Sequence, residues 1–256
     1  MALAKNTFKE AISQGRVQLG LWSSLCSPVA AEIMAQSDFD WVMFDAEHSP
    51  IDIAGLLPLL QATGNGSAVP IVRPPWNDPV LIKRVLDIGA QTILLPFVQT
   101  IDEARAAVAS TRYPPNGRRG VSGVTRASGY GRTPNYFADA ANEICTLVQV
   151  ETGEALGHLA GIAAVDGVDG VFIGPSDLSA SLGYLGQPGH VHVQAEIKKA
   201  AEVIRAAGKA PGILATSAED GKRYLDWGYV FVACGVDAKM LAVAADQLIA
   251  TMRAGT

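Results

Sequence analysis

Short apolar runs alternate along this chain with longer segments in which apolar residues recur every three or four positions. Runs rich in Val, Ile, Leu and Phe are typical of strands buried on both faces. The three- and four-residue spacing is typical of helices that bury one face. Regular alternation of the two predicts parallel βαβ units. Eight apolar runs are found, at Gln18–Leu25, Phe39–Glu47, Val69–Pro74, Thr92–Val98, Ile144–Glu151, Gly170–Gly174, Gly212–Thr216 and Tyr229–Gly235.

Eight strands separated by helices predict an α/β protein with the (β/α)8 fold, the TIM barrel. The chain has 256 residues, 49% of them apolar, which suits one such barrel with a sizeable core. No repeat or linker divides it. We therefore expect residues 1–256 to form a single (β/α)8 barrel domain. Three of the expected outer helices are Pro79–Ile88, Asp102–Ser110 and Ala218–Trp227.

The stretch Tyr113–Pro134 interrupts this alternation. It is rich in Gly, Pro, Arg and Ser and follows neither period. Loops of this length in compact domains are usually functional or disordered. Because the stretch follows the fourth strand, we expect it over the carboxyl-terminal mouth of the barrel, where active sites of this architecture lie. Its predicted role is a lid or a subunit contact, with a mobile surface loop as the alternative.

Composition narrows the classes of function. There are 20 basic and 25 acidic side chains, giving a net charge of −5, and no basic stripe of the kind that binds nucleic acid. No apolar stretch approaches the ~18 to 20 residues that span a bilayer, and the N-terminus lacks the core of a signal peptide. We expect a cytoplasmic protein without nucleic-acid or membrane partners. Cys26, Cys145 and Cys234 lie far apart among apolar residues, which predicts neither a disulfide framework nor a thiolate metal site.

Two carboxylates at the ends of neighbouring predicted strands suggest a metal site. Glu151 ends the fifth strand and Asp177 follows the sixth, so both side chains are expected above the barrel. Two carboxylates, with positions left for water and substrate, are typical of Mg²⁺ or Mn²⁺. For Glu151 the alternative is an exposed carboxylate that begins a helix. The remaining histidines, which do not form a zinc site, are His158, His190 and His192.

Further polar residues follow the second and third predicted strands. The second supplies Asp45, Glu47 and His48, and the third supplies Arg73. A neutral imidazole at His48 can take a proton from a carbon beside a metal-bound carbonyl; a histidine that only caps the next helix is the alternative. Arg73 precedes Pro74, which favours extended backbone. A fixed guanidinium there can bind a carboxylate or an enolate oxygen, and a surface salt bridge is its alternative reading.

No lysine is placed for Schiff-base chemistry. A lysine of that kind must lie inside the barrel near its mouth, with burial lowering its pKa. The lysines of this chain fall in helical patterns, near the N-terminus or, for Lys209, before the seventh strand. If this chain is an aldolase, a metal must therefore withdraw the electrons.

Five motifs occur in order along the chain: FDAEHSP (Phe44–Pro50), VRPPW (Val72–Trp76), LVQVE (Leu147–Glu151), GPSDLSASLG (Gly174–Gly183) and PGILATS (Pro211–Ser217). Together they resemble the HpcH/HpaI aldolase/citrate lyase family of class II pyruvate aldolases, which includes 4-hydroxy-2-oxoheptanedioate and 2-keto-3-deoxy-sugar-acid aldolases. The resemblance implies a barrel of the phosphoenolpyruvate/pyruvate type and an aldehyde-lyase. Such an enzyme joins pyruvate or a related 2-keto acid reversibly to an aldehyde through a metal-bound enolate, with Mg²⁺, Mn²⁺ or Co²⁺ as cofactor.

The resemblance also implies roles for individual residues. His48 is the base, acting directly or through metal-bound water, and Arg73 stabilises the enolate. Asp87 of a neighbouring subunit raises the basicity of His48, with Asp45 of the same chain as the competing partner. Glu151 and Asp177 are the metal ligands. The keto acid is contacted by Gln149 and the backbone of Ser176 and Asp177, and the apolar walls are Trp22 and Leu214.

Similar proteins are hexamers, trimers of dimers that exchange their C-terminal helix, and Ala238–Ala254 has the apolar-rich helical pattern to do so here. Two other functions remain open. A CoA-ester lyase of the citryl or malyl type resembles this family in its barrel and metal carboxylates, but needs a nucleotide site. The only basic cluster near the expected mouth is in the long loop. A barrel that binds keto acids without catalysis is the second.

Overall fold

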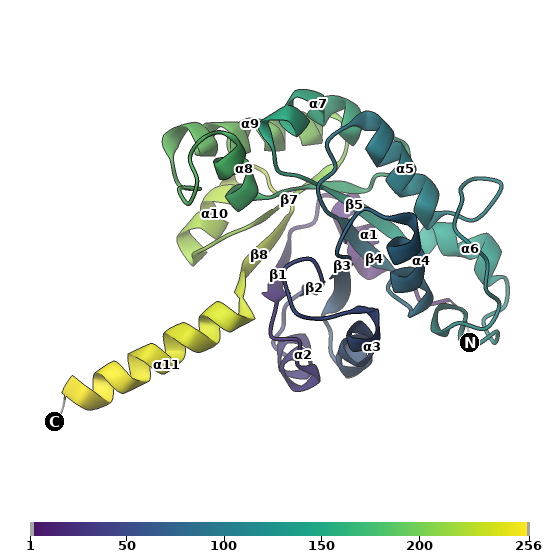
Figure 1. Cartoon of the computed structure of the whole chain (residues 1–256), viewed down its shortest axis with the longest axis horizontal. Helices are drawn as coiled ribbons and strands as arrows, with labels where there is room; N and C mark the ends of the chain where they lie inside the picture. The colour runs from purple at the N-terminus through teal and green to yellow at the C-terminus, as the bar shows by residue number, and fades with distance from the viewer. Residues whose placement is uncertain (1–2, 255–256) are drawn as a thin grey trace.

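Eight parallel strands close into a barrel in the computed structural model, which describes residues 3–254 (Figure 1). Each strand pairs with the next along the chain, and β8 closes the ring on β1. The (β/α)8 fold is therefore confirmed, while the assignment of the whole chain to one domain stays a prediction. The strands are β1 Gln18–Ser23, β2 Trp41–Asp45, β3 Val69–Arg73, β4 Thr92–Leu95, β5 Cys145–Val150, β6 Gly170–Ile173, β7 Ala210–Leu214 and β8 Phe231–Val236.

Helices surround the barrel and begin where the local chemistry allows. Ser27, Asp78 and Ser217 cap three of them by accepting a backbone N–H of the first turn, as the capping preference predicts. The helices are α1 Thr7–Ser13, α2 Pro28–Ala35, α3 Ile53–Ala62, α4 Pro79–Asp87, α5 Ile101–Thr111, α6 Tyr136–Glu143, α7 Gly153–Ala163, α8 Pro175–Ser181, α9 Val191–Ala206, α10 Ala218–Asp226 and α11 Asp237–Ala254, with 3-10 turns η1 Thr63–Asn65 and η2 Arg126–Ser128.

Aromatic rings fill the amino-terminal half of the barrel. The ring of Phe8 from α1 lies 6.1 Å from that of Trp41 and 5.7 Å from that of Phe231. Glycines make room for these rings: a Cβ on Gly20 would lie 2.1 Å from Trp41, and one on Gly212 would lie 2.1 Å from Phe231. Side chains therefore pack this end, and an open cavity lies at the opposite, carboxyl-terminal mouth, the end that carries the chemistry of such barrels.

The long stretch Tyr113–Pro134 lies elsewhere than predicted. Arg119 pairs with Asp87 at the end of α4, and the Nη1 of Arg126 donates to the carbonyl of Ile88. Both contacts are beside the turn that leads into β4, at the amino-terminal end of that strand. The expected position over the mouth is therefore wrong for these residues, because α5 runs back along the barrel before the stretch begins. A subunit contact stays a prediction.

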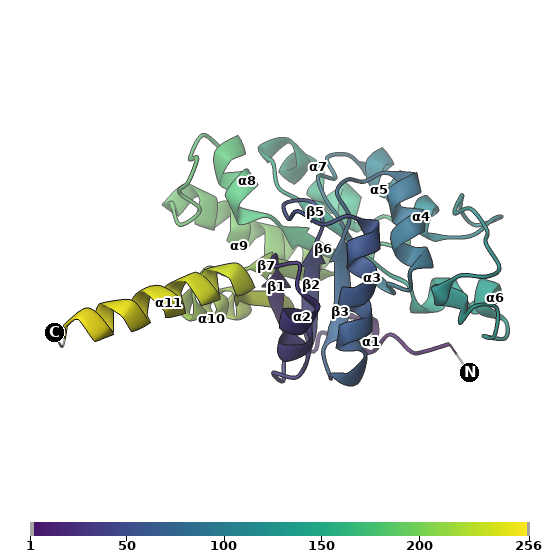
Figure 2. The same cartoon turned by 60° about the horizontal axis from the view of Figure 1, so that its bottom comes forward.

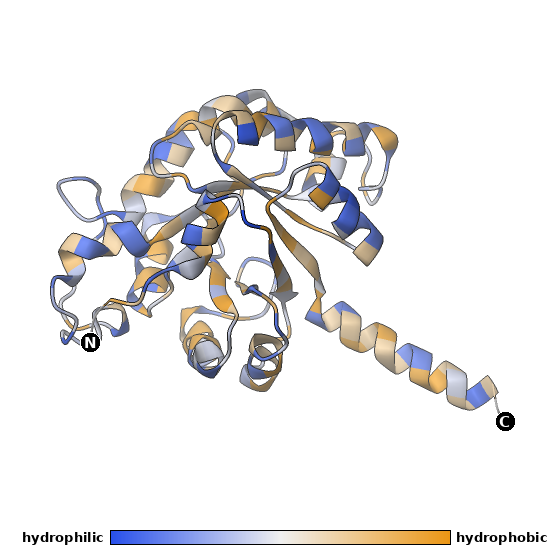
Figure 3. Cartoon of the chain, turned by 180° about the vertical axis from the view of Figure 1, so that it is seen from behind, coloured by the Kyte–Doolittle hydropathy of each residue, from blue (hydrophilic) through white to orange (hydrophobic). Residues whose placement is uncertain are grey.

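Helix α11 extends away from the barrel (Figures 1 and 2). Its start is fixed by the buried Asp237, which accepts hydrogen bonds from the backbone of Ser24 and Leu25 and from both serine hydroxyls of Ser23 and Ser24. From Lys239 onward the helix is exposed, and Figure 3 colours many of its residues as hydrophobic. None of the helices in residues 3–254 is long and apolar enough to span a membrane. The large apolar side chains exposed on α11 are Met240, Leu241, Val243, Leu248, Ile249 and Met252.

Candidate active site

A cavity of about 320 Å³ opens at the carboxyl-terminal ends of the strands. It gathers most of the residues selected from the sequence, and no lysine among the described residues lines it. Two of the selected residues do not line it. Glu151 lies next to the lining residue Gln149, and Asp87 lies at the end of α4, where it pairs with Arg119. The lining residues are Trp22, Ser24, Asp45, His48, Arg73, Gln149, Phe172, Gly174, Pro175, Ser176, Asp177, Leu214 and Val236.

Arg73 is buried at the centre of this site. Its Nε donates to Oδ1 of Asp45 at 2.9 Å and its Nη2 to Oδ2 at 2.7 Å, a two-pronged ion pair. The strand register explains it, since Asp45 and Arg73 are paired across β2 and β3. Nη1 donates to Gln149 at 3.3 Å and lies 2.7 Å from Glu47. The guanidinium also lies 4.6 Å from the ring centre of Trp22, so its position is fixed from several sides.

The pairing with Arg73 determines the charge of Asp45. Burial alone would raise the pKa of this carboxyl, but the hydrogen bonds and charge of Arg73 outweigh it, with help from the Trp22 indole N–H, and bring the pKa below its ordinary value. Asp45 also accepts the backbone N–H groups of Glu47 and His48. Both carboxylate oxygens therefore have partners other than an imidazole, and Asp45 acts in this chain as the anchor of Arg73.

The side chain of His48 is 65% exposed and points its Nε2 toward Glu47, whose Oε2 lies 3.9 Å away. Asp87 pairs instead with Arg119 at 2.8 Å, at the end of α4. Within one chain the carboxylate beside the imidazole is therefore Glu47, which the sequence placed at the end of the second strand but to which it assigned no role. The signal was present in the FDAEHSP motif, where Glu47 directly precedes His48. The contact of His48 with Asp87 of another subunit stays a prediction.

Glu151 is buried with both of its oxygens occupied. Oε1 accepts the backbone N–H of Phe97 at 3.1 Å, and Oε2 accepts the side-chain amide of Gln149. A Cβ on Gly174 would lie 2.6 Å from Oε2, so the glycine makes room for the carboxylate. Burial first, and then the charges of Glu47 and Asp177, raise the pKa of Glu151 to about 7 against the lowering hydrogen bond from Gln149. A cation at this point would relieve the cost of the buried negative charge.

Asp177 is exposed in the first turn of α8, close enough for its charge to raise the pKa of both Glu151 and Glu47. The described residues include no group of three or more His, Cys, Asp or Glu side chains suited to a metal. The predicted ligand set is the pair of carboxylates of Glu151 and Asp177, and their role stays a prediction. That set fits a hard divalent cation which keeps positions for water and substrate, and does not fit a closed zinc site.

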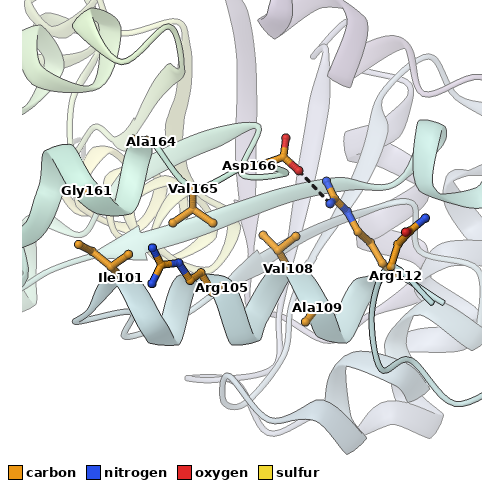
Figure 4. A pocket seen from close by; sticks show the side chains of 10 residues that line it. Ile101, Arg105, Val108, Ala109, Arg112, Gly161, Ala164, Val165 and Asp166 are labelled. Carbon is orange, nitrogen blue, oxygen red and sulfur yellow. Dashed lines mark hydrogen bonds and ion pairs between the residues drawn. The ribbon is translucent and has the colours of Figure 1, made fainter. Parts of the chain in front are cut away.

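A larger hollow lies between α5 and α7, with a volume of about 520 Å³ (Figure 4). Its floor is formed by apolar side chains such as Val108 and Val165, and one side carries the ion pair of Arg112 with Asp166 at 3.0 Å. None of the predicted site residues is among the described residues that line it. The predicted site residues therefore gather at the smaller cavity at the mouth and not at this hollow.

Comparison with known proteins places this site in a family. The model of the HpcH/HpaI aldolase/citrate lyase family matches residues 18–244. The chain therefore belongs to this family, whose aldolases depend on a divalent metal. It is 54% identical to the 4-hydroxy-2-oxo-heptane-1,7-dioate aldolase of Salmonella heidelberg (strain SL476), over 96% of this chain and 94% of that protein. The predicted class, a carbon–carbon lyase of the aldolase type, is confirmed.

Solved structures agree with this assignment. An HpcH/HpaI family protein from Burkholderia cenocepacia J2315 superposes with a TM-score of 0.94 at 36% identity, covering 97% of this chain and 100% of that one. An HpcH/HpaI aldolase from Desulfitobacterium hafniense DCB-2 gives a TM-score of 0.88 at 28% identity, covering 96% of each chain. The barrel is thus a feature that this chain shares with these relatives.

Proposed function

We propose that this aldolase cleaves and forms 4-hydroxy-2-oxo-heptane-1,7-dioate, an aldol of pyruvate. In the cleavage direction the C4 hydroxyl loses its proton, the C3–C4 bond breaks, and its electron pair passes to the pyruvate half, which takes up a proton at C3. The second product is the four-carbon aldehyde that carries the other carboxylate. The name of the Salmonella relative at 54% identity supports this substrate.

The observation that carries the proposal is the fixed position of Arg73 beside Gln149 in the cavity. Its guanidinium neutralises the negative charge that develops on the pyruvate oxygen as the bond breaks. Gln149 and the backbone of Ser176 and Asp177 hold the keto acid, and Trp22 and Leu214 exclude water from it. His48 moves the proton of the C4 hydroxyl. The exposed side chain of His48 suits this role because it can reach a substrate at the mouth.

Glu151 and Asp177 are the proposed ligands of the divalent cation, with Mg²⁺, Mn²⁺ or Co²⁺ as candidates. When bound, the cation draws electrons from the keto acid and so acidifies the carbon next to its carbonyl. The 54% identity to an aldolase favours this function over a CoA-ester lyase or a barrel without catalysis. A hexamer built by exchange of α11 and a location in the cytoplasm remain part of the proposal.

The test replaces Glu151 by Gln and measures pyruvate release from 4-hydroxy-2-oxo-heptane-1,7-dioate with Mn²⁺, together with Mn²⁺ binding by calorimetry. We expect a loss of at least ~100-fold in turnover and loss of Mn²⁺ binding, because the cation supplies several kcal/mol of transition-state stabilisation. Glu154→Gln, an exposed site three residues further on in α7, is the matched control and should behave as the wild type. Full activity of Glu151→Gln after metal removal would overturn the proposal.

A further inference from the structure

Two aromatic rings stack on each other at the mouth of the barrel outside the cavity. Trp76, in the connection from β3 to α4, and Phe97, in the connection from β4 to α5, have ring centres 5.4 Å apart and an interplanar angle of 29°. The side chains remain 50% and 37% exposed. Burial in a core therefore does not explain the pair, and neither residue lines the substrate cavity.

The backbone of Phe97 is in the left-handed region, with φ of 53°. This conformation is costly for a residue with a side chain, and such strain persists only where the surroundings hold it, often at functional sites. Pro96 precedes Phe97 and ends β4 nearby, since proline has no N–H to continue the ladder. The strained residue is thus placed directly beyond the end of a barrel strand.

The left-handed turn directs two successive amides at the end of β5. The N–H of Phe97 donates to Oε1 of Glu151 at 3.1 Å, and the N–H of Val98 donates to the carbonyl of Gln149 at 3.0 Å. Glu151 is one of the two proposed metal ligands, and Gln149 is a proposed substrate contact. The first of these hydrogen bonds fixes one carboxylate oxygen, while the side chain of Gln149 holds the other.

We propose that Trp76 is a positioning residue for the metal carboxylate: its stacking on Phe97 holds the left-handed turn whose amide orients Glu151. The inference rests on the proposed metal site and assigns a role to an exposed residue that touches neither substrate nor metal. Without the indole, Phe97 relaxes to an ordinary backbone conformation and its N–H turns away from Oε1. Glu151 then loses part of its preorganisation before the cation arrives.

Two pairs of variants test this. Trp76→Ala removes the stacking partner, whereas Trp76→Phe keeps a ring in its place. Phe97→Ala removes the ring, but alanine still pays the free-energy cost of the left-handed backbone conformation. Phe97→Gly removes both the ring and this cost, because glycine adopts positive φ freely. The Mn²⁺ dissociation constant is measured for the folded, metal-stripped proteins by calorimetry. Turnover is measured at limiting and at saturating Mn²⁺.

We expect Trp76→Ala and Phe97→Ala to weaken Mn²⁺ binding by about fivefold to thirtyfold. This factor corresponds to the free-energy cost of holding a residue with a side chain in the left-handed conformation. Trp76→Phe and Phe97→Gly should remain within about threefold of the wild type, and saturating Mn²⁺ should restore most of the turnover of Trp76→Ala. If Trp76 acted in folding alone, Trp76→Ala would lower stability, but the Mn²⁺ affinity of the folded protein would not change and saturating Mn²⁺ would not restore turnover. Unchanged Mn²⁺ affinity in Trp76→Ala would overturn the inference, whereas absence of Mn²⁺ binding by the wild type would overturn the metal site itself.

Discussion

Arg73 connects the acids of the site, because its guanidinium contacts side chains from two other strands and from the loop after β2. Asp45 takes the two-pronged pair, Glu47 lies at 2.7 Å and Gln149 accepts from Nη1 at 3.3 Å. Removing one member of a buried ion pair is costly because it leaves the other charge without compensation. The site therefore depends on Asp45 for stability as well as for geometry.

Asp45→Asn should lower the free energy of unfolding by about 3 kcal/mol, since a buried pair is broken. It should also lower kcat/KM by at least ~100-fold, because Arg73 no longer faces the developing charge. Urea unfolding and steady-state assays measure the two effects. The control is Asp102→Asn, since Asp102 pairs with Arg105 at 2.9 Å and both side chains are exposed to solvent. This substitution should change the free energy of unfolding by less than ~0.5 kcal/mol. Equal effects at the two sites would contradict the assignment.

The raised pKa of Glu151 predicts how metal binding depends on pH. Because protons and the cation compete for one carboxylate, Mn²⁺ affinity should fall by roughly tenfold for each pH unit below a pKa of about 7 and level off above it. In the metal-free protein the folded state keeps this proton more tightly than the unfolded state. Its stability should therefore fall as pH rises from 4.5 to about 7. Calorimetry and thermal melts from pH 5 to 9 check both, and Mn²⁺ affinity independent of pH would contradict them.

The positions of the site residues could be predicted from the sequence, but their pairings could not. Asp45, Arg73, Gln149 and Glu151 were all expected at strand ends, because polar residues there follow apolar runs. Which acid pairs with Arg73 depends on the register of β2 against β3, which no local pattern encodes. For the same reason the sequence left Asp45 open as a partner of His48 and gave no role to Glu47.

At the scale of elements, periodicity located all eight strands, since buried parallel strands are continuous apolar runs. The fourth was expected to continue to Val98 but ends at Leu95, because the Pro96–Phe97 turn breaks the ladder. The placement of Tyr113–Pro134 failed for a different reason. The prediction placed this stretch directly after β4, at the carboxyl-terminal mouth. Helix α5 lies between β4 and the stretch and returns the chain to the amino-terminal end of the barrel.

Helix α11 is the element that the fold of a single chain leaves uncovered. Burying each of its large apolar side chains against a second copy would contribute about 1.5 to 3 kcal/mol. Deleting residues 240–256, which retains the anchor Asp237, should therefore break the proposed helix-exchanged assembly into smaller species and lower its melting temperature. Light scattering and thermal melts measure this, with Asp246→Asn on the same helix as the control. An unchanged assembly after the deletion would contradict exchange of this helix.

On the scale of the whole molecule, the barrel separates stability from chemistry. Rings of Phe8, Trp41 and Phe231 pack against one another in the amino-terminal half. Each strand then delivers its last side chains to the opposite mouth, where backbone direction alone brings distant parts of the sequence together. A change in the mouth can thus alter activity while the packed half continues to hold the fold.

Acidic side chains outnumber basic ones at the mouth, and this excess affects how the cation and the keto acid would bind. Asp45, Glu47, Glu151 and Asp177 surround the single guanidinium of Arg73. With all four acids ionised, an incoming oxo-acid anion would meet net repulsion, which a bound divalent cation would reduce. Cation and substrate would then bind cooperatively, each tightening the other by the same factor, so the metal-stripped protein should bind the keto acid weakly.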